Sequence, residues 1–300
     1  MDTKDLSTFA SVARLGGMGR AARALNTVQS NVTQRVRRLE ESLGVTLFER
    51  SRSGARLTAA GERLMPYAAR VDALLAEAGR AARDDGVPRG TLTVGALETT
   101  AALRLSPLLA SYAKAHPQVD LVLRTGTTAE MVERVLTREL EGAFVCGPIV
   151  HPELAATAVF EEELALLSAP SNRSFSDLLS QPDLRLVVLR AGCSYRQRLE
   201  EILARRGIVG LRRLEFGTLE AILGAVAAGL GVTLMPRALI GPVWRGGRIA
   251  VHGLKPSEAR VRTVFVRRRD MPCSSALAAF QKHAVEGKNR GCWQARRRSR

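Results

Sequence analysis

The stretch VQSNVTQRVRRLEE, residues 28–41, decides how the first part of the chain folds. Its apolar residues recur every third or fourth position, so the pattern predicts a helix from about Gln29 to Glu41 with one buried face. The apolar positions on this face are Val28, Val32, Val36, Leu39 and Leu43.

The opposite face of this helix has the chemistry of a DNA reader. Asn and Gln can form two hydrogen bonds with adenine, Ser and Thr suit several bases, and Arg binds guanine or phosphate. A merely solvated face is the alternative, but such faces are usually rich in Glu and Lys. Base reading is therefore expected from Gln29, Ser30, Asn31, Thr33 and Gln34. Phosphate contacts are expected from Arg35, Arg37 and Arg38, and from Arg50 and Arg52 further along the chain.

The segments on both sides complete a winged helix-turn-helix. Two helices are expected over residues 6–15 and 18–25, the second with Ala21, Ala22 and Leu25 facing inward. After the recognition helix, two short strands around a basic turn at residues 51–54 predict a wing that can reach the DNA backbone or the minor groove.

A long helix follows the wing. Thr58 can cap it, and it should run to about Arg83. Apolar residues step by three and four along it, as in a coiled-coil seam. Such a helix could pack on its own domain, but its place before a large second domain favours dimerisation. The seam comprises Leu64, Tyr67, Val71, Leu74, Ala78 and Ala81.

The first sixty residues resemble the LysR-type transcriptional regulators. The resemblance rests on AARAL (21–25), VQSNVTQRVRRLE (28–40), LGVTLFER (43–50) and LTAAG (57–61), and it extends more weakly over most of the remaining chain. It implies a sequence-specific DNA-binding regulator, not an enzyme, that binds double-stranded DNA at two half-sites and contacts RNA polymerase. It also implies a homodimer or homotetramer controlled by a small effector.

One residue departs from the pattern of this family. Val28 stands where the family usually has a Ser that caps the recognition helix. We expect Asn26 or Thr27 to cap instead, with Gln29 as the capping-box partner of Asn26.

The remainder of the chain alternates short strands with helices, which predicts an α/β domain with parallel strand pairs. Strands are expected at 91–95, 120–125, 142–146, 186–189, 213–216, 232–235 and 260–266, and helices at 101–115, 128–140, 195–206, 219–228 and 274–284. The resemblance implies two Rossmann-like subdomains joined by two crossover strands near 164–168 and 262–266, as in the type 2 periplasmic binding proteins. The fold class is thus α plus α/β.

Domain boundaries follow from these patterns. The winged helix-turn-helix takes 1–58, the linker helix and hinge 59–88, the effector-binding domain 89–285, and a basic tail 286–300. Within the effector-binding domain, subdomain I comprises 89–163 and 267–285, and subdomain II comprises 169–261.

Four segments that follow strands could bind an effector, because ligands of such sheets bind beyond the carboxyl ends of the strands. Each places hydroxyl groups and free N–H groups near the start of a helix, which favours a carboxylate. For each Thr or Ser, the alternative is a simple N-cap. The candidate effector contacts are Thr99, Thr100, Thr127, Thr128, Gly192, Cys193, Ser194 and Thr218.

Composition agrees with a nucleic-acid partner. The formal net charge is +16 at pH 7, which indicates a polyanion, with an anionic membrane surface second. No stretch approaches the roughly 20 apolar residues of a membrane span, and Asp2, Lys4 and Asp5 interrupt any apolar leader. The cysteines are widely spaced, without a metal-binding or disulfide pattern, which suits a reducing cytoplasm.

Two other functions remain open from the residues. Cys193 near a helix start could have a lowered pKa and serve as a redox-sensing thiol. Catalysis is disfavoured because the His residues lack metal spacing and no nucleophile motif is present. No cofactor or metal is expected besides the unidentified effector.

Overall fold

The computed structural model describes residues 1–51, 54–172, 174–175, 178, 183–241 and 247–289. The side chains of residues 50, 51 and 287–289 also fall outside that description. The chain divides into two units, Met1–Asp84 with Thr137–Glu139, and Asp85–Leu136 with Leu140–Arg300. Each unit has its own hydrophobic core.

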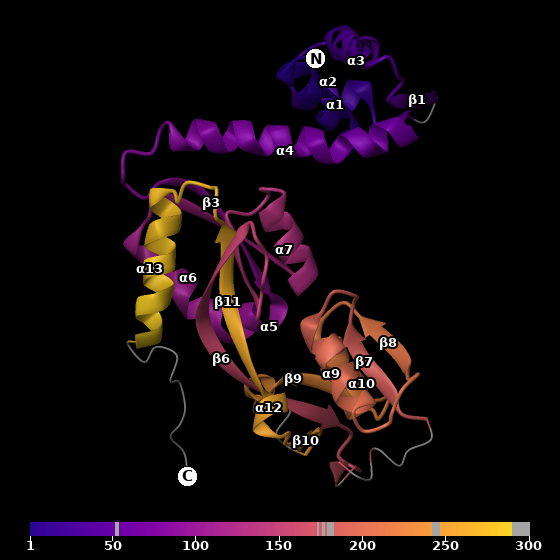
Figure 1. Ribbon diagram of the computed structural model, residues 1–300, viewed down its shortest axis with the longest axis vertical. Helices are drawn as coiled ribbons and strands as arrows, with labels where there is room; N and C mark the ends of the chain where they lie inside the picture. The colour runs from indigo at the N-terminus through magenta and orange to yellow at the C-terminus, as the bar shows by residue number, and fades with distance from the viewer. Residues whose placement is uncertain (52–53, 173, 176–177, 179–182, 242–246, 290–300) are drawn as a thin grey trace. The chain divides into compact units, whose positions relative to one another are not determined.

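The N-terminal unit is a winged helix-turn-helix followed by a long helix (Figure 1). Its core brings one face of each of the first three helices against the wing and the start of the long helix. The elements are α1 (Thr3–Leu15), α2 (Met18–Ala24), α3 (Gln29–Leu43), β1 (Phe48–Ser51), β2 (Gly54–Leu57) and α4 (Ala59–Ala81). The core residues include Leu6, Phe9, Val12, Ala21, Ala22, Val32, Val36, Leu39, Leu47, Phe48 and Ala68.

Three expectations about the apolar positions were wrong. Val28 is the N-cap of α3 and is 66% exposed, and both Leu25 and Leu43 are exposed as well. The predicted cap was also wrong, because α3 begins without any side-chain cap and Asn26 adopts a left-handed backbone, with φ of 50°. The buried face of α3 is thus shorter than the periodicity suggested, because Val28 and Leu43 lie at the two ends of the helix, beyond the core.

The wing is held against the end of α1. β1 and β2 pair antiparallel, and Ala55 donates its N–H to the carbonyl oxygen of Gly16 at 3.2 Å. A Cβ atom at Gly54 would lie 2.4 Å from that carbonyl oxygen, so only glycine permits this approach. Thr58 caps α4 by accepting a hydrogen bond from the Gly61 N–H at 3.1 Å, which confirms the predicted start of the long helix.

The second unit consists of two α/β lobes joined by two long strands (Figure 1). The first lobe contains β3 (Gly90–Leu97), β4 (Val119–Gly126) and β5 (Gly142–Cys146), with β3 parallel to both of its neighbours. The crossing strands β6 (Leu154–Ser168) and β11 (Arg260–Arg268) pair antiparallel with each other, and β11 also pairs with β5. With β10 (Ala250–His252) at one edge, the strand order is β10-β6-β11-β5-β3-β4.

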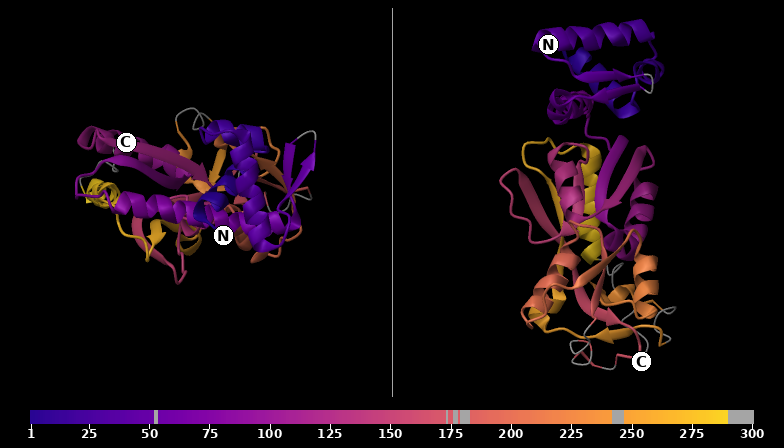
Figure 2. Two further views of the ribbon diagram at one scale, coloured as in Figure 1. Left: turned by 90° about the horizontal axis from the view of Figure 1, so that it is seen from above. Right: turned by 90° about the vertical axis from the view of Figure 1, so that its right-hand side faces the viewer.

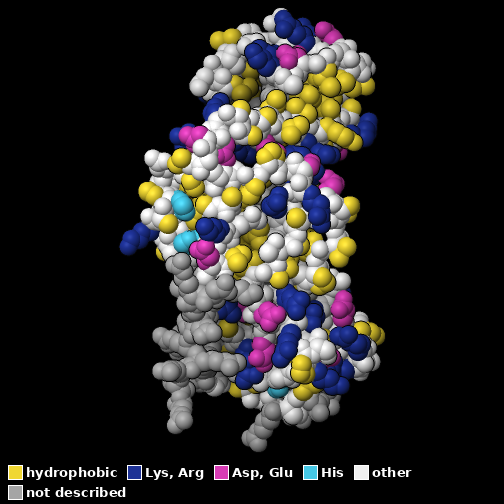
Figure 3. Space-filling view, turned by 60° about the vertical axis from the view of Figure 1, so that its left-hand side comes forward, with side chains coloured by type: hydrophobic (Ala, Val, Ile, Leu, Met, Phe, Trp, Pro, Cys, Tyr) yellow, Lys and Arg dark blue, Asp and Glu magenta, His cyan; other side chains and the backbone are white. Residues whose placement is uncertain are grey.

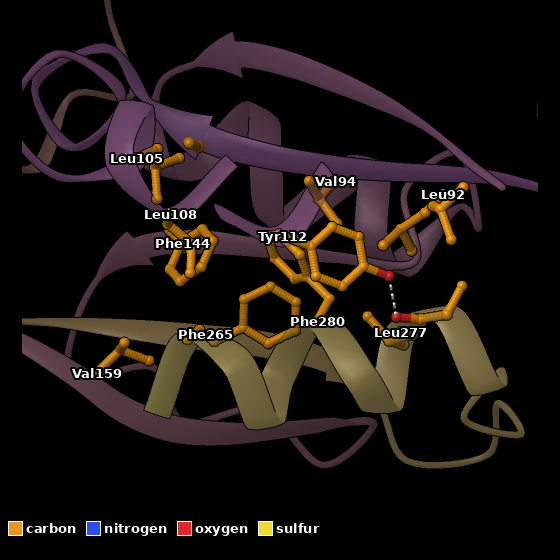
Figure 4. Close-up of a cluster of buried hydrophobic side chains, with 14 of the residues drawn as sticks. Leu92, Val94, Leu105, Leu108, Tyr112, Phe144, Val159, Phe265, Leu277 and Phe280 are labelled. Atoms are coloured by element: carbon orange, nitrogen blue, oxygen red, sulfur yellow. Dashed lines mark hydrogen bonds between the residues drawn. The ribbon is translucent and has the colours of Figure 1, made fainter. Parts of the chain in front are cut away.

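Helices cover the sheet of the first lobe. They are α5 (Glu98–Thr100), a π-helical turn (Ala101–Leu105), α6 (Ser106–Ala115), α7 (Thr128–Leu136) and α13 (Ser275–Asn289). Figure 4 shows the core between this sheet and α13, in which Phe144, Phe265 and Phe280 pack together. The hydroxyl of Tyr112 donates to the carbonyl oxygen of Ala276 at 2.8 Å, which ties α6 to α13.

The second lobe is drawn mainly in orange in the right-hand view of Figure 2. β7 (Arg185–Leu189) and β8 (Arg212–Phe216) form a parallel pair, and β9 (Thr233–Pro236) and β10 (Ala250–His252) pair with the far end of β6. The helices of this lobe are α9 (Ser194–Ala204), α10 (Leu219–Ala227) and α12 (Pro256–Ala259).

The predicted fold class is confirmed, while several elements differ in detail. The helix expected over 101–115 contains the π-helical turn, and α7 ends at Leu136 instead of residue 140. β6 is much longer than the crossing expected near 164–168, and β10 and α12 were not predicted.

Candidate DNA-binding surface and effector cavity

The outer face of α3 presents five exposed polar or basic side chains. They lie opposite Val32, Val36 and Leu39, which are fully buried in the core of the N-terminal unit. None of the five forms a hydrogen bond or ion pair with any other residue that the structure describes. We call Gln29, Ser30, Gln34, Arg37 and Arg38 the reading face.

Two predicted DNA contacts on the flanks of α3 already have partners inside the domain. Arg35 forms an ion pair with Asp5 of α1, with 3.2 Å between Nη1 and Oδ1, and the Asp5 carboxylate is nearly buried. The amide nitrogen of Asn31 donates to the hydroxyl of Thr27 at 2.9 Å. Thr33 is half-buried. Arg35 and Asn31 therefore have contacts within the domain, which the pattern of polar positions alone could not reveal.

Glu40 has a structural role that sequence reasoning missed. Its Oε1 accepts hydrogen bonds from the N–H groups of Leu47 and Phe48, at 2.8 and 3.3 Å. Both of these residues are buried, so the carboxylate satisfies backbone donors at the start of the wing. Glu at the end of a recognition helix, just before the wing, was the signal available in the sequence.

Two of the predicted phosphate contacts cannot be placed. Arg52 lies outside the described residues, and Arg50 belongs to β1 but its side chain is not described.

The predicted seam of α4 divides into a buried and an exposed part. Leu64 packs on the core of the N-terminal unit, where Ala68, which the predicted seam omitted, is fully buried. Tyr67 and Leu74 are 65% and 50% exposed, and the unpredicted Leu75 is also 50% exposed. Val71 is half-buried, and Ala78 and Ala81 are exposed. Figure 3 shows hydrophobic side chains gathered on one side of the N-terminal unit.

A small cavity of about 20 Å³, partly open to solvent, lies between the two lobes of the second unit. It is found where β3, β4 and β7 end, as the rule for the carboxyl ends of parallel strands predicts. We call it the interlobe cavity. Its lining residues are Leu97, Glu98, Thr99, Gly126, Thr127, Leu189, Arg190, Cys193, Ser194 and Tyr195.

Four predicted effector contacts line this cavity, and three more lie near it. Thr99, Thr127, Cys193 and Ser194 are in the lining. Thr128 accepts a hydrogen bond from the Ser194 hydroxyl at 2.8 Å, and a Cβ at Gly192 would lie 2.9 Å from the Thr127 hydroxyl. Thr100 is buried in α5 without lining the cavity. Sequence reasoning missed Leu97, Leu189 and Arg190.

Thr218 does not belong to this group. It caps α10 by accepting a hydrogen bond from the Ala221 N–H at 3.2 Å, and it is exposed away from the cavity lining. The simple capping alternative is therefore correct at this position. Thr218 and Thr127 both follow a strand, and only the arrangement of the lobes distinguishes them.

Polar contacts connect the lobes beside the cavity. Arg190 of the second lobe forms an ion pair with Glu130 of α7, with 3.0 Å between Nε and Oε1. The Ala129 N–H donates to the carbonyl oxygen of Gly192 at 3.4 Å. Together with the bond between Ser194 and Thr128, these contacts hold the lobes together around the cavity.

The Thr99 side chain is unusual in lacking a partner. The residue is 3% exposed, and its hydroxyl oxygen has no partner with hydrogen-bond geometry in the described part of the protein, although the Tyr195 hydroxyl lies close enough to interact with it. A buried hydroxyl without a partner costs about 1–3 kcal/mol. Thr99 is one of the residues that line the cavity.

The thiols at this site do not have the electrostatics of a redox sensor. Burial is the largest influence on Cys193 and raises the pKa of its thiol. Burial likewise raises the pKa of Cys146, which packs in the same hydrophobic cluster, to about 11. Because the thiolate is the reactive form, both groups are less reactive at neutral pH than a free cysteine.

Neither a metal centre nor a membrane helix emerges from the described residues. They contain no group of three or more His, Cys, Asp or Glu side chains that could hold a metal ion. None of the described helices is long and apolar enough to cross a membrane.

A winged helix-turn-helix with an exposed basic reading face, followed by a two-lobed domain with a cavity, defines a ligand-responsive DNA-binding regulator. Residues 3–62 match the family of bacterial regulatory helix-turn-helix proteins of the lysR type, and residues 85–288 match the LysR substrate-binding domain. The chain belongs to the LysR family of transcriptional regulators.

Known relatives agree over nearly the whole length. The chain is 40% identical over 283 residues to the HTH-type transcriptional regulator GltR of Bacillus subtilis, covering 94% of this chain and 96% of that protein. It is 38% identical over 280 residues to the HTH-type transcriptional regulator SoxR of an Arthrobacter species, covering 93% and 95%.

A solved structure of full-length CbnR complexed with its target DNA is 26% identical. Its TM-score is 0.68, and the match covers 96% of this chain and 100% of that one. The protein is thus a DNA-binding transcriptional regulator with an effector-binding domain, and not an enzyme. The redox alternative is not favoured.

Proposed function

We propose that the reading face of α3 recognises specific base pairs through Gln29, Ser30 and Gln34 and holds phosphates through Arg37 and Arg38. The observation that carries this assignment is the division of α3. The five side chains of the reading face are exposed, whereas Asn31 and Arg35 on its flanks have partners in the domain. An exposed side chain can meet a base edge without first breaking a bond in its own protein.

The test separates base reading from phosphate binding. Binding sequences are selected from random DNA with the wild-type protein, and affinities are then measured for Gln34→Ala and Arg37→Ala across base-pair variants and salt concentrations. Gln34→Ala should lose about 1–3 kcal/mol at particular base pairs. Arg37→Ala should weaken binding to every sequence and reduce the salt slope by about 1.

The control is Glu41→Ala, an exposed position on the same side of the helix that lies outside the reading face. An equal loss on all sequences for Gln34→Ala would remove its assigned role in base reading.

The protein acts in this proposal as a homodimer in the cytoplasm, with α4 as the contact between subunits. Two half-sites require two reading faces, and the exposed Tyr67, Leu74 and Leu75 supply an apolar strip on α4. Sedimentation of Leu74→Glu should show a shift toward monomer relative to Leu74→Met. Retention of the wild-type oligomer by Leu74→Glu would place the contact elsewhere. Assembly into a tetramer and contact with RNA polymerase belong to the same proposal.

A small carboxylate-bearing effector binds in the interlobe cavity and shifts the population between two arrangements of the lobes. The buried Thr99 hydroxyl and the polar contacts across the cavity support this assignment, because a ligand there touches both lobes. Footprinting with candidate small acids should show effector-dependent changes for the wild type and for Thr218→Val. Thr99→Val should lose them, and an unchanged response in that variant would contradict the site.

A further inference from the structure

The interlobe cavity contains a carboxylate that has no partner. Glu98 lines the cavity, is half-buried, and forms no ion pair or hydrogen bond with any described residue. Arg190, the basic residue in the same lining, is already paired with Glu130 through both Nε and Nη2, at 3.0 and 3.2 Å. A half-buried carboxylate without a cation is costly, because burial penalises its charge.

One basic and two acidic side chains act on the charge of Glu98. Arg190 acts on it favourably, whereas Glu220 of α10 and Glu130 of α7 both repel it. Burial is the largest influence and raises the pKa of Glu98. Because Arg190 is already paired with Glu130, Glu98 is the carboxylate in the lining that a positively charged group would stabilise.

The remaining walls of the cavity are suited to an apolar group. Leu97, Leu189 and Tyr195 contribute apolar surface to its lining. A second small cavity, of about 10 Å³, shares Leu189, Cys193 and Tyr195 with it and is also lined by Val188, Leu199, Leu234 and Met235. Each cavity has room for about one water molecule. The lobes must therefore move apart to admit an effector, whose apolar portion then faces these residues of the second lobe while its polar end faces Glu98 and Thr99.

We propose that the effector of this regulator carries a protonated amine, which Glu98 binds, in addition to its carboxylate. Small amino acids with apolar side chains are the chemical class that the residues of this lining favour. The proposal rests on the proposed effector site. It assigns the ammonium group to Glu98 and hydrogen bonds from the polar end of the ligand to the buried Thr99 hydroxyl.

The test compares matched probes on the full-length protein. The probes are leucine and valine, and the corresponding acids without an amino group, isocaproate and isovalerate. Binding is measured by isothermal titration calorimetry and by the shift in melting temperature. The amino acids should bind, and their deaminated counterparts should bind roughly tenfold more weakly or not at all, because a charge-assisted hydrogen bond is lost.

Two variants then locate the selectivity. Glu98→Gln should lose the preference for the amino acid, whereas Glu220→Gln, which removes a nearby carboxylate outside the lining, should retain it. Equal or tighter binding of isocaproate and isovalerate, or an unchanged preference in Glu98→Gln, overturns the assignment of an ammonium group.

The same measurements keep the two proposals distinguishable. If the deaminated acids bind and Thr99→Val abolishes that binding, the effector site stands and the amine proposal fails. If none of the probes binds to the wild-type protein, the proposal of an apolar amino acid fails, and footprinting with other small acids still decides the effector site.

Discussion

The reading face of α3 and the interlobe cavity both contain polar side chains without partners among the residues that the structure describes, yet the two regions differ in exposure. Gln34 and Arg37 are surrounded by water, which satisfies them until DNA displaces it. The Thr99 hydroxyl is buried, so its missing hydrogen bond lowers the stability of the folded protein. Exposed polar side chains can thus bind a ligand without lowering the stability of the free protein, whereas a buried polar group without a partner lowers that stability until a ligand binds.

The charged side chains on the flanks of α3 differ from those of the reading face, because they form hydrogen bonds or ion pairs within the N-terminal unit. Glu40 binds backbone donors of the wing and Arg35 binds Asp5. Partnered side chains should therefore matter for folding, and partnerless ones for ligand binding.

Replacing Glu40 with Ala should lower the free energy of unfolding by about 1.5–3 kcal/mol, because two buried N–H groups lose a charged acceptor. The neighbouring Glu41 is exposed, so Glu41→Ala should change stability by less than about 0.5 kcal/mol. Calorimetric unfolding of the full chain measures both. Similar stabilities for the two variants would mean that the wing does not depend on this carboxylate.

The N-terminal unit was predicted well because its signals are local. Helical periodicity located α3 and α4, and Thr58 marked the start of the long helix. The missed contacts of Glu40 and Arg35 join residues 7 and 30 positions away in sequence. No pattern within one helix could show that Arg35 faces α1 while Arg38 faces outward.

The cavity was predicted less completely because long-range contacts create it. Each segment after a strand offered a Thr or Ser, but only the packing of the lobes brings Thr127 and Ser194 to one cavity and leaves Thr218 outside. β6 was missed over most of its length because its partner β11 lies about a hundred residues away in the chain, as in the bond between Arg262 and Glu161 with a separation of 101.

Replacing Arg35 with Ala should destabilise the N-terminal unit by about 1–3 kcal/mol, because the nearly buried Asp5 carboxylate loses its partner. The exposed Arg38 offers the contrast. Arg38→Ala should leave the melting temperature close to that of the wild type and weaken DNA binding instead. If calorimetry showed Arg38→Ala to be the less stable variant, the division between flank and reading face would not hold.

Replacing Thr99 with Val should make the protein more stable by about 1 kcal/mol, since the new methyl group needs no hydrogen bond. The same change at the exposed Thr218 should destabilise by about 1 kcal/mol, because α10 loses its cap. Thermal unfolding without effector measures both changes. A loss of stability in Thr99→Val would indicate that the hydroxyl is satisfied in the free protein.

The smallest expected effect is a dependence on pH at Glu98. Burial raises the pKa of this carboxyl group in the folded protein above that in the unfolded chain. The folded state therefore binds a proton at Glu98 more readily. The resulting stability is fully present below the unfolded pKa and is lost as the pH rises through the folded pKa.

Glu98→Gln removes this titration, so its melting temperature should rise relative to that of the wild type as the pH increases from about 4 to about 7. Glu220→Gln, at an exposed position, should show a much smaller change. If the melting temperature of Glu98→Gln instead fell relative to that of the wild type as the pH rises, Glu98 would have a stabilising cation in the free protein. The expected increase in the difference between the two melting temperatures is the effect of a buried carboxylate without a bound cation. An amino acid bound in the cavity should abolish this increase.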